Sequence, residues 1–365
     1  MKHLTFGFVG LGLIGGSIAR ALKIWDSECT IVAYNRSKEP VRHAISDKVV
    51  DIEAPEVDES FERCDYIFLC TPVEKNNEFV KAIKEFMNPT AILTDVGSVK
   101  GPIMDVIYEN KLQANFIGGH PMAGSERVGY DNSKARILEN AYYVLAPTPE
   151  VDSKKLEEFK DIITNLKSIP IILDAKEHDY IVGGISHLPH LIAASLVELV
   201  KESDNDSNTM KRVAAGGFKD ITRIASSSPD MWEQILDTNA DNVASLLEDY
   251  INKLTSLKAK IENHESLYDF FKDARDYRDS FASQSSGPIK SEYSITVDIA
   301  DRPGSIAPIA SILALTEINI KNIGITHNRE AAEGALSISF YEEEDIEKAL
   351  DVLSRYGYTV KKRNL

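Results

Sequence analysis

A glycine-rich string near the start of the chain limits the fold more than any other feature. Residues Gly10–Gly15 read G-x-G-x-x-G, after an apolar strand-like run over 5–10 and before a run with helical spacing over 14–24. The first glycine permits a tight turn, the second lets a pyrophosphate approach the backbone, and the third allows close helix–strand packing. The string predicts a dinucleotide site at a helix N-terminus. The expected contacts are Gly10, Leu11, Gly12, Leu13, Ile14 and Gly15.

The position that contacts the adenine ribose lacks the usual acid. An Asp or Glu about 20 residues after the glycines normally bonds the ribose 2′-hydroxyl, but this chain has Asn35, Arg36 and Ser37. Asn35 does not repel a phosphate, and Arg36 and Ser37 are able to bind one. These residues alone tilt the expectation toward NADP+ over NAD+. The alternative is a solvated Arg36, with Asn35 still bonding the ribose.

Strand-like and helix-like patterns alternate through the first half of the chain. Short apolar runs that end in turn residues predict strands at 30–34, 65–70, 91–95, 115–118, 141–146 and 171–173. The alternation predicts a Rossmann-type, doubly wound parallel sheet over residues 1–174. Carboxyl ends of strands form the ligand crevice of such a sheet. This adds Thr71, Pro72, Asp95 and Gly97 to the expected cofactor contacts.

Two further domains follow the sheet. Strand signals vanish over 175–285, where helices with wide apolar arcs predict an all-α domain buried against a second copy. Residues 286–290 form the clearest linker. Patterns over 291–365 follow the order β-α-β-β-α-β, which predicts a ferredoxin-like module.

Three histidines and an arginine lie in unusual strings. His120 lies in the glycine-rich string 118–126, which we expect to be irregular; His187 and His190 flank a proline, and Arg223 ends a basic string. A histidine in a loop beside the cofactor crevice is a candidate for catalysis. No third ligand lies at a telling spacing, so we expect no metal.

Taken together, these strings resemble the bacterial prephenate dehydrogenases that carry a C-terminal ACT domain. The resemblance covers essentially the whole chain. It rests on the strings Gly10–Gly15, Asp95–Lys100, Gly119–Glu126, Ser186–His190, Gly216–Ala225 and Asp301–Gly304. It implies NAD(P)+-dependent oxidative decarboxylation of prephenate to 4-hydroxyphenylpyruvate, with NAD+ the cofactor that the family suggests.

The resemblance also implies roles for individual residues. His120 looks like the base for the substrate hydroxyl, and Ser98 like its hydrogen-bonding partner. Arg223 looks like the cation that meets a substrate carboxylate. The remaining substrate contacts would be His187, His190, Ser125, Glu126 and Asp220. Glu126 and Asp220 could equally be surface acids, and Trp232 reads more readily as a core or interface residue.

The C-terminal module implies an effector. ACT domains usually pair and bind amino acids at their interface, and the implied ligand is L-tyrosine as a feedback inhibitor. The expected contacts are Asp301, Arg302, Pro303, Gly304 and Asn319. A dimerisation module that binds no ligand is the alternative.

Composition limits the partners and the compartment. The formal net charge of −16 argues against a nucleic-acid partner. No apolar run reaches the roughly 18 residues of a membrane helix, so no membrane is expected. Three cysteines are too few for a disulfide framework, which indicates the cytoplasm. A homodimer through the helical domain is expected.

Three alternatives to this function stay open. Arogenate dehydrogenase is the nearest, since no residue decides between the keto group of prephenate and the ammonium of arogenate. A different dehydrogenase with a helical second domain would need a catalytic lysine or aspartate on that domain and no ACT module. A non-catalytic sensor of dinucleotide and amino acid would have no need of a base beside a hydroxyl.

Overall fold

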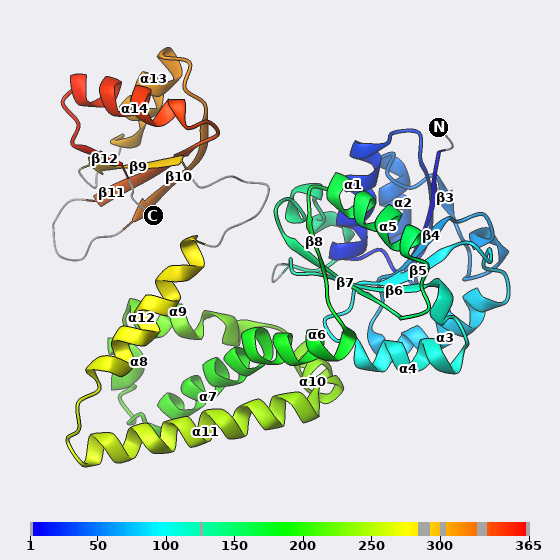
Figure 1. The fold of residues 1–365 in the computed structure, drawn as a ribbon, viewed down its shortest axis with the longest axis horizontal. Coiled ribbons are helices and arrows are strands. Elements are labelled where there is room, and N and C mark those ends of the chain that lie inside the picture. Colours follow the sequence, from blue (N-terminus) through cyan, green and yellow to red (C-terminus); the bar gives the residue numbers. More distant parts are fainter. Residues whose placement is uncertain (1–2, 125–126, 284–292, 300–303, 327–333, 363–365) are drawn as a thin grey trace. The chain divides into compact units, whose positions relative to one another are not determined.

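The chain forms two compact units, residues 1–263 and residues 264–365 (Figure 1). The structure, a computed structural model, describes residues 3–124, 127–283, 293–299, 304–326 and 334–362. The first unit contains a large sheet with its covering helices and a helical part. The second unit contains a small sheet with two helices and one preceding helix.

The large sheet contains eight strands within the described residues. They are β1 Thr5–Val9, β2 Thr30–Tyr34, β3 Ile52–Glu53, β4 Tyr66–Leu69, β5 Ile92–Asp95, β6 Phe116–Pro121, β7 Tyr142–Pro147 and β8 Ile169–Ile172. Their order is β3-β2-β1-β4-β5-β6-β7-β8, and every neighbouring pair except one is parallel. The central order confirms the Rossmann-type arrangement predicted from the glycine string.

The exception is the pair β6 and β7, which is antiparallel. The prediction of a parallel sheet was therefore wrong at this pair. The connection over 122–141 contains only the short 3-10 turns Tyr130–Asn132 and Ala135–Ile137 among its described residues, and no crossover helix. The chain thus enters β7 from the edge at which β6 ends. An antiparallel pair needs no long crossover, whereas a parallel pair does.

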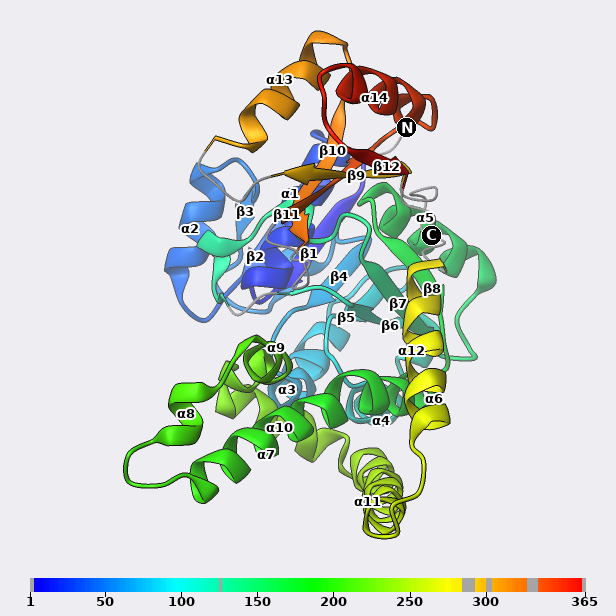
Figure 2. The same cartoon turned by 90° about the vertical axis from the view of Figure 1, so that its left-hand side faces the viewer.

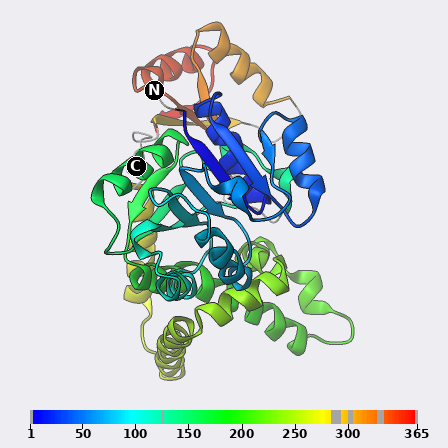
Figure 3. The same cartoon turned by 90° about the vertical axis from the view of Figure 1, so that its right-hand side faces the viewer.

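Helices cover both faces of the large sheet. One face packs against α1 Leu13–Trp25, α2 Lys38–Ser46 and α5 Ser153–Asn165. The other face packs against α3 Val73–Lys84 and α4 Gly101–Glu109. Figure 3 shows the large sheet of this unit from the side opposite to that in Figure 2. A sheet buried on both faces needs strands that are apolar throughout, and β4 is buried along its whole length.

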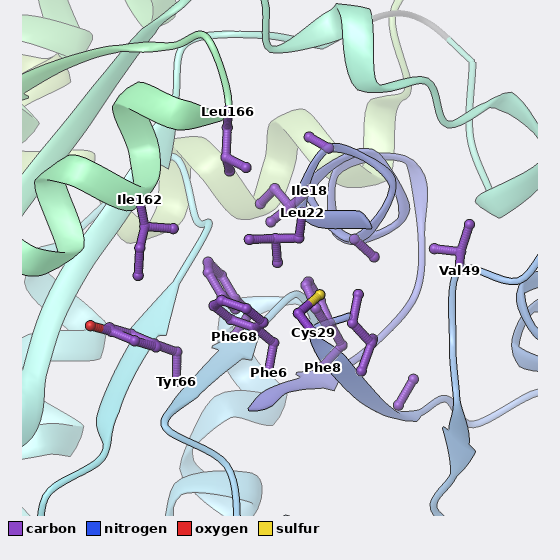
Figure 4. Close-up of a cluster of buried hydrophobic side chains, with 14 of the residues drawn as sticks. Phe6, Phe8, Ile18, Leu22, Cys29, Val49, Tyr66, Phe68, Ile162 and Leu166 are labelled. Carbon is purple, nitrogen blue, oxygen red and sulfur yellow. The ribbon is translucent and has the colours of Figure 1, made fainter. Parts of the chain in front are cut away.

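The core on the first face is built around stacked aromatic rings (Figure 4). Phe8 and Phe68 lie with ring centroids 5.0 Å apart and planes 7° apart, and Phe6 stacks on Tyr66 at 5.7 Å. Ile18 and Leu22 of α1 close over these rings, and both are fully buried. Each buried aromatic ring removes a large apolar area from water, so this stack fixes α1 firmly on the sheet.

The helical part of the first unit follows β8. It comprises α6 Ala175–Val182, α7 Leu188–Ser203, α8 Thr209–Val213, α9 Gly216–Thr222, α10 Pro229–Thr238 and α11 Ala240–Glu262, with a 3-10 turn over Arg223–Ser226. A π-helical turn, Gly183–His187, joins α6 to α7. Such turns insert an extra residue and often mark functional sites. Figures 1 and 2 both show α6 beside α4, at the end of the sheet that carries the site described below.

The run Ala175–Ser203 is long and apolar enough to cross a membrane by length and composition alone. It was not predicted as an apolar run of this length, because glycine, serine and histidine lie among its aliphatic residues. Its His178, His187 and His190 are buried within the unit. Only 28% of its most apolar window is buried, so much of this helix presents apolar side chains on the surface of the unit.

The second unit follows the element order β-α-β-β-α-β after the helix α12 Tyr268–Ser283. Its elements are β9 Tyr293–Ile299, α13 Ile306–Leu315, β10 Ile320–Thr326, β11 Gly334–Phe340, α14 Glu344–Arg355 and β12 Val360–Lys362. The sheet order is β10-β11-β9-β12, and all three pairs are antiparallel. Buried aliphatic residues of both helices and of the sheet form one core. The predicted linker over 286–290 lies outside the described residues.

Candidate active site

The glycine string Gly10–Gly15 forms a cradle, in which side chains at the glycine positions would clash with neighbouring atoms or occupy open space. Gly10 has φ +95°, and a Cβ there would lie 2.7 Å from the Cys70 carbonyl oxygen. A Cβ on Gly15 would lie 2.8 Å from the carbonyl oxygen of Gly10, whereas one on Gly12 would meet nothing within 4 Å. Gly12 precedes α1, and no side chain caps this helix. The open space at Gly12 and the uncapped helix N-terminus fit a dinucleotide pyrophosphate.

The residues after β2 are held against this cradle. The Leu11 backbone N–H donates to Asn35 Oδ1 at 3.0 Å, and Asn35 Nδ2 donates to the Ser37 carbonyl at 2.8 Å. Arg36 is exposed. Further along the crevice, the Thr71 hydroxyl, next to Pro72, donates to Asn76 Oδ1 at 2.8 Å. The predicted cofactor contacts therefore lie at the carboxyl ends of neighbouring strands.

A fully buried ion pair lies behind this crevice. The Lys100 ammonium donates to the Asp95 carboxylate and, at 2.8 Å, to the Gly119 carbonyl. Asp95 also accepts from the backbone N–H groups of Gly97 at 2.9 Å and Gly119 at 3.1 Å. Burial lowers the pKa of Lys100, and the charge of Asp95 opposes that shift. The pair fastens the end of β5 to β6.

The glycine-rich string 118–126 was expected to be irregular, but its first four residues belong to a strand. β6 continues through Gly118 and Gly119 to Pro121, and it pairs there with β7. A Cβ on Gly119 would lie 2.5 Å from the Asp95 carbonyl oxygen. The glycine thus serves close approach of two strands and does not break the strand. His120 comes at the carboxyl end of β6, partly exposed.

His120 begins a chain of hydrogen bonds that ends at a carboxylate. His120 Nδ1 lies 2.8 Å from His178 Nε2, and His178 Nδ1 lies 2.8 Å from Asp179 Oδ1. A carboxylate only accepts, so His178 Nδ1 carries a proton, and in the tautomer protonated there Nε2 is the acceptor. His120 then donates from Nδ1. The free lone pair of His120 is therefore on Nε2, which is the atom able to take a proton from a ligand.

Asp179 links three elements of the unit. Its two carboxylate oxygens accept the backbone N–H groups of Lys100 and Gly101, both at 2.7 Å, at the start of α4. Its carbonyl accepts from Asn239 Nδ2 at 2.8 Å, just before α11. A carboxylate at a helix N-terminus is stabilised by the helix dipole. The support of the histidine pair is thus anchored in both the sheet and the helical part.

The surroundings of His120 keep its ring neutral. Burial, followed by the nearby positive charge of Lys100, holds the pKa of His120 well below its ordinary value of 6.5, with smaller contributions from His178 and His187. A neutral imidazole with a free lone pair can act as a general base at neutral pH. The arrangement can therefore accept one proton from a hydroxyl at Nε2 of His120.

Two more histidines come from the π-helical turn and from α7. His187 Nδ1 lies 3.1 Å from Asn239 Nδ2, and an amide nitrogen only donates, so His187 accepts there and carries its proton on Nε2. Burial lowers the pKa of His187 to about 4, so the ring is neutral. His190 stacks on Trp232 with centroids 3.6 Å apart and planes 16° apart. Trp232 thus belongs to the histidine cluster, although the sequence favoured a core or interface role for it.

Several predicted site residues form no hydrogen bond with this cluster. The hydroxyl of Ser98, partly exposed after β5, has no hydrogen-bond partner among the described residues. Arg223 and Asp220 are exposed, although the turn that begins at Arg223 packs against α7, the helix of His190. Outside the described residues lie Ser125, Glu126, Asp301, Arg302 and Pro303. Gly304 has φ +90°, and Asn319 is exposed just before β10.

Four polar residues that build the cluster were not predicted from the sequence: Lys100, His178, Asp179 and Asn239. Lys100 lay in a string that carried the resemblance but received no role, because lysines are rarely buried. The adjacent pair His178 and Asp179 was the one available signal. Its partner His120 lies 58 residues away, and no local pattern predicts that contact.

Comparison with known proteins connects this geometry to one family. Residues 18–171 match the family model described as the nucleotide-binding domain of prephenate dehydrogenase. Residues 174–273 match the model described as the dimerization domain of the same enzyme. The boundary between the two matches falls between β8 and α6.

Individual relatives match over most of their length. A prephenate dehydrogenase of Bacillus subtilis is 36% identical over 94% of both chains. A crystal structure of prephenate dehydrogenase from A. aeolicus, in complex with hydroxyphenyl propionate and NAD+, is 30% identical with a TM-score of 0.71, over 77% of this chain and 99% of that one. An arogenate dehydrogenase structure from Synechocystis is 29% identical with a TM-score of 0.70, over 76% of this chain and 100% of that one.

Proposed function

The chain belongs to the prephenate dehydrogenase family, and from this premise we propose that it oxidises and decarboxylates prephenate to 4-hydroxyphenylpyruvate. The observation that carries the proposal is the proton acceptor Nε2 of His120, held by His178 and Asp179 at the carboxyl end of β6, the same edge of the sheet as the dinucleotide cradle. A sensor of dinucleotide and amino acid would need no such acceptor. The nicotinamide ring, when bound, supplies the hydride acceptor.

The residues of the chain account for the remaining steps. A hydride leaves the ring carbon that bears the hydroxyl, while Nε2 of His120 takes the hydroxyl proton. The positive charge that forms on His120 is stabilised through His178 by the Asp179 carboxylate. The electron pair of the bond to the ring carboxylate moves into the ring as CO2 leaves. The proton then returns to the phenol oxygen, so no net proton is consumed.

Binding of the two substrate carboxylates needs local cations, because the chain has a net charge of −16. We assign one carboxylate to Arg223, whose exposed guanidinium forms no ion pair within the described residues. His187, which donates from Nε2, and His190 contribute neutral contacts. Ser98 is assigned to the substrate hydroxyl, and Ser125 and Glu126 are assigned as further substrate contacts.

The rate of nicotinamide reduction with prephenate tests the function directly. Activity with prephenate supports the proposal, whereas activity with arogenate alone would establish the alternative represented by the Synechocystis relative. Folded protein that reduces the cofactor with neither substrate would contradict both assignments.

We expect Arg223→Ala to raise KM for prephenate by about 10- to 100-fold with a smaller change in kcat, because a charge-assisted hydrogen bond is lost in the bound ground state. Steady-state kinetics at constant ionic strength measures both constants. Arg212→Ala, which removes an exposed arginine on α8, is the matched control. An unchanged KM in Arg223→Ala would refute the carboxylate contact.

The second unit is assigned as an ACT module that binds L-tyrosine. Its β-α-β-β-α-β order supports this assignment, together with the string Asp301–Gly304. Gly304 has a backbone conformation that favours glycine, and it lies two residues before α13. Feedback inhibition requires that L-tyrosine bind more tightly to a less active state.

Deletion of residues 288–365 is expected to abolish inhibition by L-tyrosine while the enzyme retains activity. The prediction follows from the separation of the chain into two compact units. The measurement is the initial rate against L-tyrosine concentration for the full chain and the shortened chain. A shortened enzyme that is inhibited as strongly as before would place the effector in the first unit.

A homodimer completes the proposal. The helical run Ala175–Ser203 is mostly unburied within the unit and apolar, and the matching family model is described as a dimerization domain. Isologous contact with a second copy would cover this surface. A cytoplasmic location is consistent with free thiols, of which Cys29 and Cys64 are buried.

A further inference from the structure

The amide that replaces the usual acid after β2 is bonded to the backbone through both its oxygen and its nitrogen. Asn35 Oδ1 accepts the Leu11 N–H, and Asn35 Nδ2 donates to the Ser37 carbonyl. A carboxylate could make the first bond but not the second, because it has no hydrogen to donate. The loop is therefore built for an amide. A ribose 2′-hydroxyl finds no anionic acceptor at this position, and a 2′-phosphate meets no like charge.

The next residue offers an uncommitted cation. Arg36 is exposed, and no hydrogen bond or ion pair engages its guanidinium within the described parts of the chain. Ser37 follows it, and its hydroxyl makes no capping bond to α2. A guanidinium presents five N–H donors in a planar fork that matches phosphate geometry. These two side chains follow the strand whose end faces the Gly10–Gly15 cradle.

We propose that this chain binds the 2′-phosphorylated dinucleotide NADP+ in preference to NAD+, with Arg36 and Ser37 on the 2′-phosphate. The inference rests on the dinucleotide site of the proposed function and names its cofactor. It separates this chain from the A. aeolicus enzyme, whose complex contains NAD+. Asn35 favours the 2′-phosphate because it carries no negative charge, and Arg36 favours it because it carries a positive charge.

Direct binding of the reduced nucleotides tests the proposal without turnover. The full-length protein is titrated with NADPH and with NADH, and nucleotide fluorescence reports binding without substrate. We expect NADPH to bind at least about tenfold more tightly than NADH. Arg36→Ala should weaken NADPH binding by about tenfold or more and change NADH binding less than twofold, because the lost hydrogen bonds are charge-assisted.

Two further variants complete the test. Asn35→Asp should reverse the preference, because a carboxylate repels the 2′-phosphate and accepts from a 2′-hydroxyl. Arg63→Ala is the matched control, since Arg63 is exposed and precedes β4, at the opposite edge of the sheet. Tighter binding of NADH by the unmodified protein, with equal effects of Arg36→Ala on both nucleotides, would overturn the proposal. If the folded protein bound neither nucleotide, the dinucleotide site and the proposed function would fail as well.

Discussion

We expect His120→Asn to lower kcat with prephenate by about 10²–10⁴-fold, the usual contribution of a general base. Asparagine keeps a polar side chain of similar reach, but it has no lone pair basic enough to take the hydroxyl proton. The affinity for the dinucleotide should change less than twofold, since His120 bonds only to His178 among the described residues. Steady-state kinetics and nucleotide titration measure the two quantities separately.

The pH profile gives this variant a second readout. The pKa of His120 lies well below 6.5, so the ring is neutral and active at pH 7. Turnover of the unmodified enzyme should persist through pH 6.5 and fall only at a pH well below it, where the ring gains a proton, and His120→Asn should lose that acid limb. His264→Asn is the matched control, because His264 is exposed with φ +55°, a conformation that asparagine tolerates. Near-normal turnover in His120→Asn would refute the role of base.

Lys100→Met is expected to lower the free energy of unfolding by about 3–5 kcal/mol, the cost of leaving a buried charge without its partner. The side chains of Lys100 and Asp95 are both 0% exposed, so water cannot replace the lost ammonium. The Gly119 carbonyl also loses a donor. Urea unfolding of the full chain, followed by a probe in the first unit, measures the change.

Two variants separate the ion pair from general disruption. Asp95→Asn combined with Lys100→Met removes both charges and should recover much of the lost stability, since neutral partners avoid the desolvation cost. Lys154→Met changes a lysine whose side chain is 83% exposed, and it should alter stability by less than about 0.5 kcal/mol. If Lys100→Met unfolded like Lys154→Met, the buried pair would contribute little to the fold.

Much of the fold was predictable because the local sequence pattern of many segments agrees with the structure that they adopt in the folded chain. The strand Thr30–Tyr34 has the predicted bounds, and the glycine string forms the turn that its spacing implied. Apolar runs do not encode strand direction, so the antiparallel pairing of β6 and β7 could not be read from them. Glycine serves either turn formation or close approach of two backbones. At Gly119 we expected irregular structure, but the glycine allows close approach of two strands.

The histidines of the candidate site were predictable from the sequence, whereas the side chains that support them were not. His120, His187 and His190 stood out in unusual strings, and the structure brings the first two next to His178 and Asn239 respectively. The supporting residues are buried polar side chains, and their hydrogen bonds are made to partners that are distant in sequence. Lys100 reads as a surface lysine until β6 is packed against it. A side chain of this kind is specified by the assembled fold and not by its neighbours in sequence.

The hydrogen bonds of the Asp179 carboxylate limit how the helical part can move relative to α4. It accepts two backbone N–H groups of α4, and its neighbour His178 holds His120. Any hinge movement of the helical part about α6 would have to break both bonds to α4 before it could separate His178 from His120. The proton acceptor thus keeps its orientation while substrate enters and product leaves. Each catalytic cycle can begin without an assembly step, and the entropy of ordering the acceptor was lost once, during folding.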